Sequence, residues 1–447
     1  MLTIGELYTF DILGLTQDGC GIGMVGDSKI FIDGVLLGEK VAGIITKIEP
    51  GYAAARLFEI IESKGDRIPP LCRYFNRCGG CSLQFIPYDQ QLTVKRDIVK
   101  EAAVRIAGLD ARLVKEAIGS EDILYYRNKA QYPAQHSEGK WKVGFYKSRS
   151  REVIDLDFCF LQHKLSNDVR KAVRIYLDEL GQNEQFIERK AAIHHIVTRV
   201  SHSTCDVMVI LVTALNELPY VERLIEKLTD KVPKLKSLYI NHNEKGTSQV
   251  MGEKNTLIFG EEKIIDSIGS FNFVISPLSF FQVNPTQTRV LYDKVREFAG
   301  LVGREAVLDL YCGTGTISIY LSEAAGMVIG VEGVEEAVKD AEINARINRV
   351  KNVEFICGRV EHVVGKICDS VDVVIVDPPR KGCKKEVLDA MVRINPARIV
   401  YVSCNPSTMA ADVKYLSQKG YGVSVIQPID MFPHTAHVET VTLLRKV

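Results

Sequence analysis

A cysteine ends an apolar segment near the carboxyl end of the chain, and the signal for a helix start follows it directly. The sequence there reads VSCNPSTMAADV, and it places Cys404 before Asn405 and Pro406. Asparagine is a good N-cap residue, and proline suits the first position of a helix. A thiol at a helix N-terminus has its thiolate stabilised by the helix dipole, which lowers the thiol pKa. The pattern indicates a nucleophilic cysteine, with a buried structural cysteine as the alternative.

A glycine-containing turn forms a second candidate site, in the sequence VLDLYCGTGTISIYL. Gly313 and Gly315 lie between an apolar strand and a helix, where glycine lets the backbone approach a ligand closely. The next apolar segment ends in Glu332, at a separation from which an acidic side chain accepts hydrogen bonds from ribose hydroxyls. A solvated glutamate is the alternative. Because the third glycine of the dinucleotide fingerprint is missing, the turn suits S-adenosylmethionine (SAM) at least as well as NAD.

A third candidate is Asp377, which follows the apolar segment VDVVIV and opens the sequence DPPRKG. Ligands of open parallel sheets bind outside the carboxyl ends of the strands. Asp377, the glycine turn and Cys404 each follow an apolar segment, so we expect them at one edge of a sheet. A simple turn is the alternative for the DPP sequence taken alone.

These residues require a parallel sheet, and the second half of the chain has the pattern for one. From about residue 305, apolar segments alternate with helical or mixed segments, and the apolar ones are AVLDLY, MVIGVE, VEFIC, VDVVIVDPP and RIVYVSC. Apolar strands that alternate with helices predict a mostly parallel sheet covered by helices on both faces. The fold class of this part is therefore α/β.

The first half of the chain has different patterns. Residues 1–62 alternate apolar and polar positions between glycine turns, which predicts a small β-barrel. The double proline in DRIPPLC marks a linker, and the spacing of apolar residues then predicts a helix over about 90–107. Residues 120–275 mix β-rich segments with two helical segments, which is typical of an α+β domain.

Composition sets broad limits on the class of protein. The chain has 447 residues, 46% of them hydrophobic and 25% charged, with a net charge of +0, so we expect a soluble globular protein of two or three domains. No apolar segment approaches the roughly 20 residues of a membrane span, and the first residues lack the pattern of a secretory signal. We therefore expect a cytoplasmic protein that does not bind membranes. The balanced charge argues against a uniformly basic nucleic-acid coat but allows a local basic patch.

A cysteine cluster lies just after the linker. Eleven cysteines without an export signal argue against a disulfide framework, so clustered cysteines indicate metal binding or catalysis. Cys72, Cys78 and Cys81 follow a C-x5-C-x2-C spacing, and Cys159 lies far downstream in DLDFCFLQH. Spacing alone fits zinc and an iron–sulfur cluster comparably, because both accept four thiolates.

A basic and aromatic segment, GKWKVGFYKSRSRE, covers residues 139–152. Its cations can neutralise phosphates, and Trp141, Phe145 and Tyr146 can stack on unpaired bases. The segment predicts a contact with RNA, with a solvated hairpin as the alternative.

Five motifs, in order along the chain, carry a resemblance to a known family. They are FFQVNPTQT, LDLYCGTGT, DPPRKG, VSCNPST and MFPHTAHVETV. Together they resemble the RNA uracil-C5 methyltransferases, which make 5-methyluridine. The N-terminal segment also resembles the TRAM RNA-binding domain, so the resemblance covers essentially the whole chain.

The resemblance implies a mechanism and two catalytic residues. Uracil C5 is a poor nucleophile toward a sulfonium methyl group, and addition of a thiolate to C6 converts the ring to an enolate with electron density at C5. By resemblance, Cys404 is this nucleophile and Glu439 is the general base that removes the C5 proton. His434 and His437 lie in the same motif and have a suitable pKa for a base, but we expect structural roles for both.

Other residues match positions that bind cofactors in relatives. Those implied to bind SAM are Gln282, Tyr311, Glu332 and Asp377. Those that match the ligands of a [4Fe-4S] cluster are Cys72, Cys78, Cys81 and Cys159. The match favours iron–sulfur over zinc, and we expect the cluster to be structural because methyl transfer needs no electron. Phe280 and Phe281 are expected to accommodate a uracil flipped out of the RNA, with core packing as the alternative.

The combined interpretation is a three-part SAM-dependent methyltransferase. We expect a TRAM-like, OB-like β-barrel in 1–62, a central α+β domain with the cysteine cluster in 63–277, and a Rossmann-like catalytic domain in 278–447. The resemblance also implies that the helix near 90–110 packs on the catalytic domain. The expected substrate is structured RNA, 23S rRNA before tRNA, and the expected protein is a monomer.

Two other classes stay open. An amino-group methyltransferase acting on adenine or protein can use DPP near its target nitrogen without a nucleophilic cysteine. A non-catalytic RNA-binding protein can keep the same fold, although the presence of both Cys404 and Glu439 argues against it.

Overall fold

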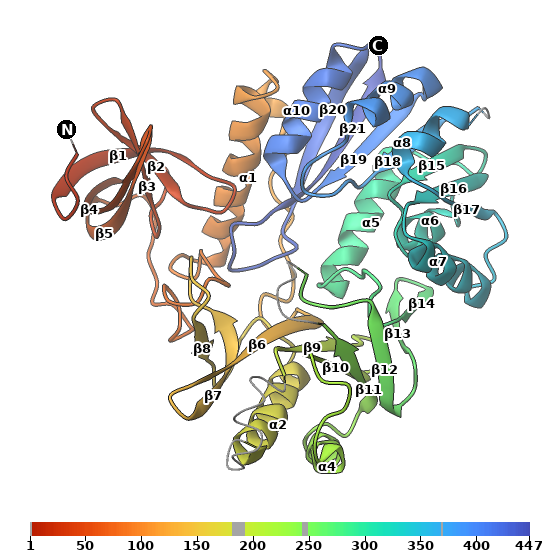
Figure 1. Cartoon of the computed structure of the whole chain (residues 1–447). Helices are drawn as coiled ribbons and strands as arrows, with labels where there is room; N and C mark the ends of the chain where they lie inside the picture. Colours follow the sequence, from red (N-terminus) through yellow and green to blue (C-terminus); the bar gives the residue numbers. More distant parts are fainter. Residues whose placement is uncertain (1, 181–192, 244–248, 368–369) are drawn as a thin grey trace.

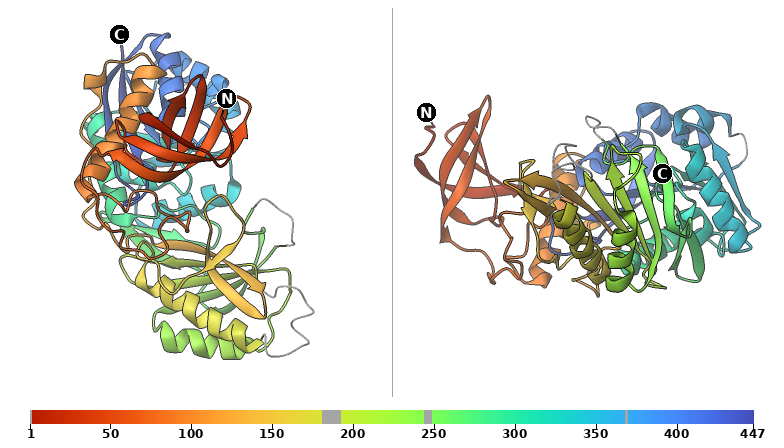
Figure 2. Two further views of the ribbon diagram at one scale, coloured as in Figure 1. Left: turned by 90° about the vertical axis from the view of Figure 1, so that its left-hand side faces the viewer. Right: turned by 60° about the horizontal axis from the view of Figure 1, so that its bottom comes forward.

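The computed structural model describes residues 2–180, 193–243, 249–367 and 370–447. In these residues the chain forms a closed barrel, two seven-stranded sheets and a two-stranded sheet. Figure 1 shows the barrel in red, the central sheet in yellow and green, and the C-terminal sheet in cyan and blue. The barrel lies at one end of the molecule, as the right-hand view in Figure 2 also shows.

The barrel consists of five strands in the closed order β1-β2-β3-β5-β4. Their bounds are β1 (Leu7–Leu15), β2 (Gly21–Val25), β3 (Ser28–Ile32), β4 (Lys40–Glu49) and β5 (Tyr52–Glu62). Along β1, buried Phe10 and Ile12 alternate with exposed Asp11 and Leu13, which is the period-two pattern of a strand with one face in a core. The predicted barrel is confirmed.

Helix α1 (Tyr88–Arg105) lies between the barrel and the C-terminal sheet (Figure 1). It buries Ile98 in the core of the barrel, and it buries Val99 and Ala103 in the core of the C-terminal sheet. The helix predicted from the spacing of apolar residues is confirmed. Its two buried faces explain how it joins parts of the chain that are distant in sequence.

The central sheet has the strand order β12-β11-β10-β9-β6-β7-β8. The strands are β6 (Lys129–Ser137), β7 (Lys140–Tyr146), β8 (Val153–Asp155), β9 (His195–Val200), β10 (Val207–Thr213), β11 (Leu235–His242) and β12 (Lys254–Gly260). Helices α2 (Lys164–Leu180) and α4 (Val221–Lys231) share a core with one face of this sheet. The expected α+β mixture and its two helices are confirmed.

The C-terminal sheet has the order β17-β16-β15-β18-β19-β21-β20. Its strands are β15 (Ala306–Leu310), β16 (Met327–Glu332), β17 (Val353–Cys357), β18 (Val373–Val376), β19 (Arg398–Ser403), β20 (Tyr421–Ile429) and β21 (Glu439–Lys446). Its helices are α5 (Pro285–Ala299), α6 (Thr316–Leu321), α7 (Glu335–Ile347), α8 (Val360–Val363), α9 (Lys385–Ile394) and α10 (Pro406–Ser417). The predicted α/β fold is confirmed.

The direction of the strands brings the candidate residues to one edge of the C-terminal sheet. Strands β15 to β19 pair in parallel, so their carboxyl ends lie at the same edge. Strand β21 runs antiparallel to β19, so its first residue lies at that edge as well. This active-site edge therefore collects the ends of β15, β16, β18 and β19 together with the start of β21.

A hairpin joins the central sheet to the C-terminal part. Strands β13 (Ile264–Ile268) and β14 (Phe271–Ile275) form the two-stranded sheet, and their buried residues share a core with α5 and α6 and with one face of the central sheet. The division into domains at 62 and 277 stays a prediction. No helix in the described parts of the chain is long and apolar enough to cross a membrane.

Candidate active site

Cys404 lies at the junction of β19 and α10. The strand ends at Ser403, and the helix begins at Pro406. Asn405 caps the helix, because its Oδ1 accepts a hydrogen bond from the backbone N–H of Ser407 at 3.0 Å. The predicted N-cap and the proline at the helix start are confirmed. Cys404 therefore stands at the active-site edge, just before a helix N-terminus.

Glu439 reaches the same edge from the opposite direction. It is the first residue of β21, in which Thr440 pairs with Ser403 of β19. The Thr440 hydroxyl also donates to the backbone oxygen of Ser403 at 3.2 Å. Glu439 is 6% exposed, and its carboxylate is close enough to Cys404 to influence the thiol pKa. The two residues, 35 positions apart in sequence (439 minus 404), meet in the fold.

Burial is the main influence on the Glu439 carboxyl. It raises the pKa of Glu439 to about 8, and the negative charge of Asp377 adds to the rise while Arg380 opposes it. A general base works best when its pKa lies near the operating pH. Glu439 is therefore a stronger base than an exposed glutamate.

The Cys404 thiol departs from the sequence-based expectation. We expected the helix N-terminus to lower its pKa, but burial and the Glu439 carboxylate raise the pKa of Cys404 to about 11. The expectation was wrong because loss of hydration disfavours the thiolate more than the helix terminus favours it. Without a bound substrate, Cys404 is a neutral thiol at neutral pH.

Arg380 opposes the rise, and sequence reasoning assigned it no role. Its guanidinium hydrogen-bonds the Cys404 sulfur and lowers the pKa of the thiol. The signal that points to it is its place in DPPRKG, directly after a strand whose end lies at the active-site edge. An arginine there supplies a permanent positive charge beside the nucleophile.

Hydrogen bonds to α10 hold the loop that carries Arg380. The backbone oxygen of Arg380 accepts from Asn405 Nδ2 at 3.0 Å. Asp412 Oδ2 accepts from the backbone N–H of Cys383 at 2.7 Å and from the Tyr401 hydroxyl at 2.6 Å. These bonds fix the loop relative to the helix that begins after Cys404.

The glycine turn after β15 has an unusual backbone. Tyr311, Gly313 and Gly315 have φ angles of 65°, 55° and 76°. A Cβ on Gly315 would lie 2.7 Å from the Phe355 ring, so this position requires glycine. A non-glycine residue such as Tyr311 keeps this conformation only where its surroundings impose it, which is common at ligand sites.

Glu332 closes the glycine turn from the neighbouring strand. Its two carboxylate oxygens accept hydrogen bonds from the backbone N–H groups of Gly313 at 3.1 Å and Val334 at 2.9 Å. Because β16, β15 and β18 are adjacent, Glu332, Tyr311 and Asp377 come together at the active-site edge. Burial raises the pKa of Asp377 to about 6.

A buried carboxyl that sequence reasoning did not select lies behind this turn. Asp309 is fully buried, and it accepts a hydrogen bond from the Ser318 hydroxyl. Burial raises the pKa of Asp309 to about 7, and in the described structure its Oδ1 has no hydrogen-bond partner. In the sequence, the position of this acidic residue inside the apolar strand VLDLY could have indicated a buried carboxyl. An orphaned buried oxygen is unusual and suits a site that receives a polar ligand.

The segment before α5 approaches the glycine turn. Thr314 Oγ1 donates to the backbone oxygen of Phe280 at 3.4 Å, and Gln282, which is half-buried, is the second residue after Phe280. Phe280 is 67% exposed, whereas Phe281 is 5% exposed and packs in the core. The expectation that both rings face a flipped base was wrong for Phe281, because the core already covers it.

The two histidines before Glu439 differ in their contacts. The backbone N–H of His434 donates to Gln91 Oε1 at 2.9 Å, and its ring Nδ1 lies 3.2 Å from Gln91 Nε2. The structural role expected of His434 is confirmed. Burial lowers the pKa of His437, whose structural role stays a prediction.

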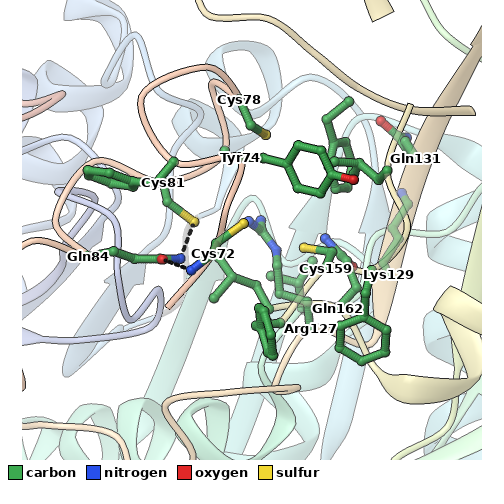
Figure 3. A pocket seen from close by; sticks show the side chains of 18 residues that line it. Cys72, Tyr74, Cys78, Cys81, Gln84, Arg127, Lys129, Gln131, Cys159 and Gln162 are labelled. Carbon is green, nitrogen blue, oxygen red and sulfur yellow. Dashed lines mark hydrogen bonds between the residues drawn. The ribbon is translucent and has the colours of Figure 1, made fainter. Parts of the chain in front are cut away.

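The clustered cysteines line one cavity of about 440 Å³ (Figure 3). They are Cys72, Cys78, Cys81 and Cys159. Gln84 links two of them, because its Oε1 accepts from the backbone N–H of Cys72 at 3.1 Å and its Nε2 donates to Cys81 Sγ at 3.2 Å. Arg127 also lines the cavity and brings a positive charge to it, whereas burial lowers the pKa of Lys129, another lining residue, to about 7.

The donor set of this cavity is thiol only. No carboxylate or histidine is among its described lining residues. In the described parts of the chain, no group of three or more histidine, cysteine or acidic side chains is placed so that it could hold a metal ion. The four cysteines line the same cavity, and the metal centre that the resemblance implied stays a prediction.

The basic segment 139–152 forms β7 and the turn that leads into β8, and it lines part of an open pocket of about 690 Å³. Trp141 is 7% exposed and packs in the core of the central sheet, so the expectation that it stacks on RNA bases was wrong. Phe145 is half-buried, and Tyr146 is 41% exposed. The remaining lining of this basic pocket comes from Gly79, Gly80, Lys147, Ser148, Arg149, Ser150 and Arg151.

Comparison with known families matches the C-terminal part of the chain. A family model described as tRNA (Uracil-5-)-methyltransferase matches residues 366–447. A second model, described as Methyltransferase domain, matches residues 307–394. Both matches lie in the part that forms the active-site edge.

Individual relatives match almost the whole chain. An uncharacterized RNA methyltransferase of Caldanaerobacter subterraneus subsp. tengcongensis is 45% identical over 99% of both chains, and one of Clostridium tetani is 43% identical over 98% of this chain and 96% of its own. The crystal structure of the Pyrococcus abyssi tRNA (uracil-54, C5)-methyltransferase with S-adenosyl-L-homocysteine has a TM-score of 0.76 and 30% identity, covering 98% of this chain and 99% of that chain. Because these relatives match nearly the whole chain and the solved structure shares its architecture, the chain belongs to the family of RNA uracil-C5 methyltransferases that use SAM.

Proposed function

We propose that this protein methylates C5 of a uridine in structured RNA through a covalent bond between Cys404 and C6 of the base. The observation that supports it is the meeting of Cys404, Arg380 and Glu439 at the active-site edge. The reaction needs a nucleophile, a positive charge that favours its anion, and a base of raised pKa, and these three residues supply them.

The proposed steps balance in atoms and electrons. The Cys404 thiol first releases its proton to water. The resulting thiolate beside Arg380 bonds to C6, and an electron pair of the ring moves toward C5 and O4. C5 then takes the methyl group of SAM, which leaves as S-adenosylhomocysteine. Glu439 removes the C5 proton, the C5–C6 double bond reforms, and the bond between Cys404 and C6 breaks. One methyl group enters the base and one proton leaves it.

For SAM we propose the binding residues Gln282, Tyr311, Glu332 and Asp377. The turn between β15 and α6 supports this assignment, because its imposed backbone and the orphaned oxygen of Asp309 are features of a ligand site. A carboxylate oxygen accepts more than one hydrogen bond, so Glu332 can hold both the turn and the ribose hydroxyls.

We also propose that Cys72, Cys78, Cys81 and Cys159 hold a [4Fe-4S] cluster. The cavity of about 440 Å³ that they line is much larger than a zinc ion requires with sulfur ligands at about 2.3 Å. Hydrogen bonds to the cluster sulfurs and nearby charges tune such centres. Gln84 offers the hydrogen bond and Arg127 the charge. When bound, the cluster would cross-link the segment around Cys72 to the segment around Cys159.

For the RNA, we propose 23S rRNA first and tRNA second. The barrel and the cysteine cluster favour 23S rRNA through the family resemblance alone, which is an argument by analogy. The Pyrococcus abyssi relative, named for its action on tRNA, covers 98% of this chain, barrel included, and this favours tRNA. We propose that the protein acts as a monomer in the cytoplasm.

The test is methyl transfer from labelled SAM to unmodified 23S rRNA fragments and, separately, to unmodified tRNA, followed by nucleoside analysis. We expect 5-methyluridine in the rRNA and none with Cys404→Ala. 5-Methyluridine in tRNA alone would keep the chemistry and overturn the rRNA target. A methylated amino group, or activity that survives Cys404→Ala, would favour the amino-group methyltransferase, and no product from either RNA would favour a binding protein.

A further inference from the structure

The loop of residues 430–438 leads directly into Glu439, and side chains of α1 hold its first half. Lys95 donates to the backbone oxygen of Phe432 at 2.9 Å and forms a buried ion pair with Asp430. Gln91 holds His434 through the two contacts described above. These contacts leave the last residues before Glu439 to be held from elsewhere.

The residues after Cys81 hold the middle of the loop, from His434 to Ala436. The backbone N–H groups of Ser82 and Leu83 both donate to the backbone oxygen of His434, at 3.1 Å and 3.0 Å. In the other direction, Ser82 Oγ accepts from the backbone N–H of Ala436 at 2.9 Å. His434 has a φ of 68°, a conformation that a non-glycine residue keeps only where its surroundings impose it.

Close packing leaves the loop little room to relax around Ser82. Ala436 is 1% exposed and Val438 is 2% exposed. A Cβ on Gly19, in the barrel turn between β1 and β2, would lie 2.7 Å from the Cβ of Ala436 and 3.6 Å from Ser82 Oγ. The barrel, the segment after Cys81 and the loop before Glu439 therefore meet at Ser82.

The position of Ala436 bears directly on Glu439, because only His437 and Val438 separate them. A buried N–H without an acceptor is costly, so loss of the Ser82 hydroxyl favours a shift of Ala436 toward another partner. A misplacement of about 1 Å at a reacting group can lower a rate by about 100-fold.

We propose that Ser82 is a positioning residue for Glu439 and links the segment of Cys81 to the proton-removal step. The inference rests on the proposed function, because it takes Glu439 as the general base. In the described residues, Ser82 has no hydrogen bond to Cys404 or Arg380, which take part in forming the bond to C6. Its loss therefore slows the resolution of the covalent adduct and leaves the formation of the adduct intact.

The test measures the formation and the resolution of the covalent adduct. It uses the full chain, SAM and the unmodified form of the RNA that the protein methylates. In single-turnover experiments with Ser82→Ala, we expect the adduct to form on denaturing gels at the wild-type rate. We expect its resolution to product to slow by about tenfold, as for one lost buried hydrogen bond. The KM for RNA should be unchanged. Ser82→Thr keeps the hydroxyl and should restore the rate of adduct resolution. Ser267→Ala, in the hairpin β13–β14, is the matched control and should leave that rate unchanged.

Several results would overturn the positioning role. Adduct resolution at the wild-type rate in Ser82→Ala contradicts the positioning role. An equal slowing of adduct formation and adduct resolution contradicts it as well. If Ser82→Ala does not fold, hydrogen exchange of the wild-type protein decides, since the amides of Ser82, Leu83 and Ala436 should exchange as slowly as those of β21. Fast exchange at Ala436 overturns the inference. Absence of 5-methyluridine from wild-type reactions overturns the proposed function as well.

Discussion

At the residue scale, buried Glu439 lies close to half-buried Cys404, and the raised pKa of Glu439 sets a pH dependence of the reaction. Glu439 accepts a proton only as a carboxylate, and its pKa of about 8 means that this form increases as pH rises through 8. We expect single-turnover adduct resolution to accelerate by about tenfold per pH unit below pH 8 and to level off above it. Quench-flow with labelled SAM measures this rate.

Two variants separate Glu439 from other carboxyls. Glu439→Gln should abolish the inflection and accumulate the covalent adduct, because the amide cannot take the C5 proton. Glu386→Gln, at an exposed position on α9, should keep the wild-type profile. A wild-type rate that does not change between pH 6 and 9 would contradict the role of Glu439.

Arg380 gives a second prediction at this scale. Arg380→Ala removes the cation that lowers the pKa of Cys404, so the thiolate becomes rarer. Alkylation of Cys404 by iodoacetamide at pH 8 should slow by about tenfold for each unit by which the pKa rises. Mass spectrometry of the Cys404 peptide measures the rate, and the exposed Cys205 is an internal standard. Equal rates with and without Arg380 would show that it does not stabilise the thiolate.

At the scale of elements, one buried ion pair attaches α1 to the loop that follows β20 of the C-terminal sheet. The side chains of Lys95 and Asp430 are 0% exposed, and the Tyr88 hydroxyl also donates to Asp430 at 2.8 Å. Removal of one partner leaves a buried charge, so we expect Lys95→Met to lower the free energy of unfolding by about 3–5 kcal/mol. Urea denaturation followed by circular dichroism measures the change.

A second variant tests the charge itself. Asp430→Asn removes the charge and keeps an oxygen for the backbone N–H of Phe432, which donates to Asp430 Oδ1 at 2.9 Å. Combined with Lys95→Met, it should recover most of the lost stability, since no buried charge is left unpaired. If the double variant is as unstable as Lys95→Met, packing of the lysine stem and not its charge holds α1.

At the scale of the whole molecule, we propose that RNA binds along a path from the barrel to the central sheet across the basic pocket. Arg149 of the hairpin β7–β8 forms an ion pair with Asp33 of the barrel at 3.0 Å, so the two parts touch there. Lys147 lies 3.5 Å from Glu152, and exposed pairs of this kind are weak enough to be exchanged for phosphates.

Binding measurements test this path. Lys147→Ala combined with Arg151→Ala should weaken RNA binding and lower the slope of log K against log salt by about 1.4, which is about 0.7 for each phosphate contact to a single strand. Arg223→Ala combined with Lys231→Ala removes the same charges from the exposed face of α4 and should leave the slope unchanged. Identical slopes for both double variants would exclude the pocket from the RNA contact.

Local patterns account for much of what the sequence predicted. The apolar strands around Asp377 and Cys404, the cap at Asn405 and the barrel pattern in 1–62 depend on residues that are neighbours in the chain. Parallel strands bring their carboxyl ends to one edge, so that edge could also be predicted once the alternation of strands and helices was read.

The sequence by itself therefore determined the elements, their order and the residue types at the active-site edge. The tertiary structure decided the surroundings of these residues. It placed the Arg380 guanidinium in hydrogen-bond contact with Cys404, raised the pKa of Cys404, and buried Trp141 and Phe281. It also decided that Ser82 holds the loop before Glu439. Burial and the sum of nearby charges depend on residues far apart in the chain, so no local pattern contains them, whereas caps and hydrophobic periods are complete within a few residues.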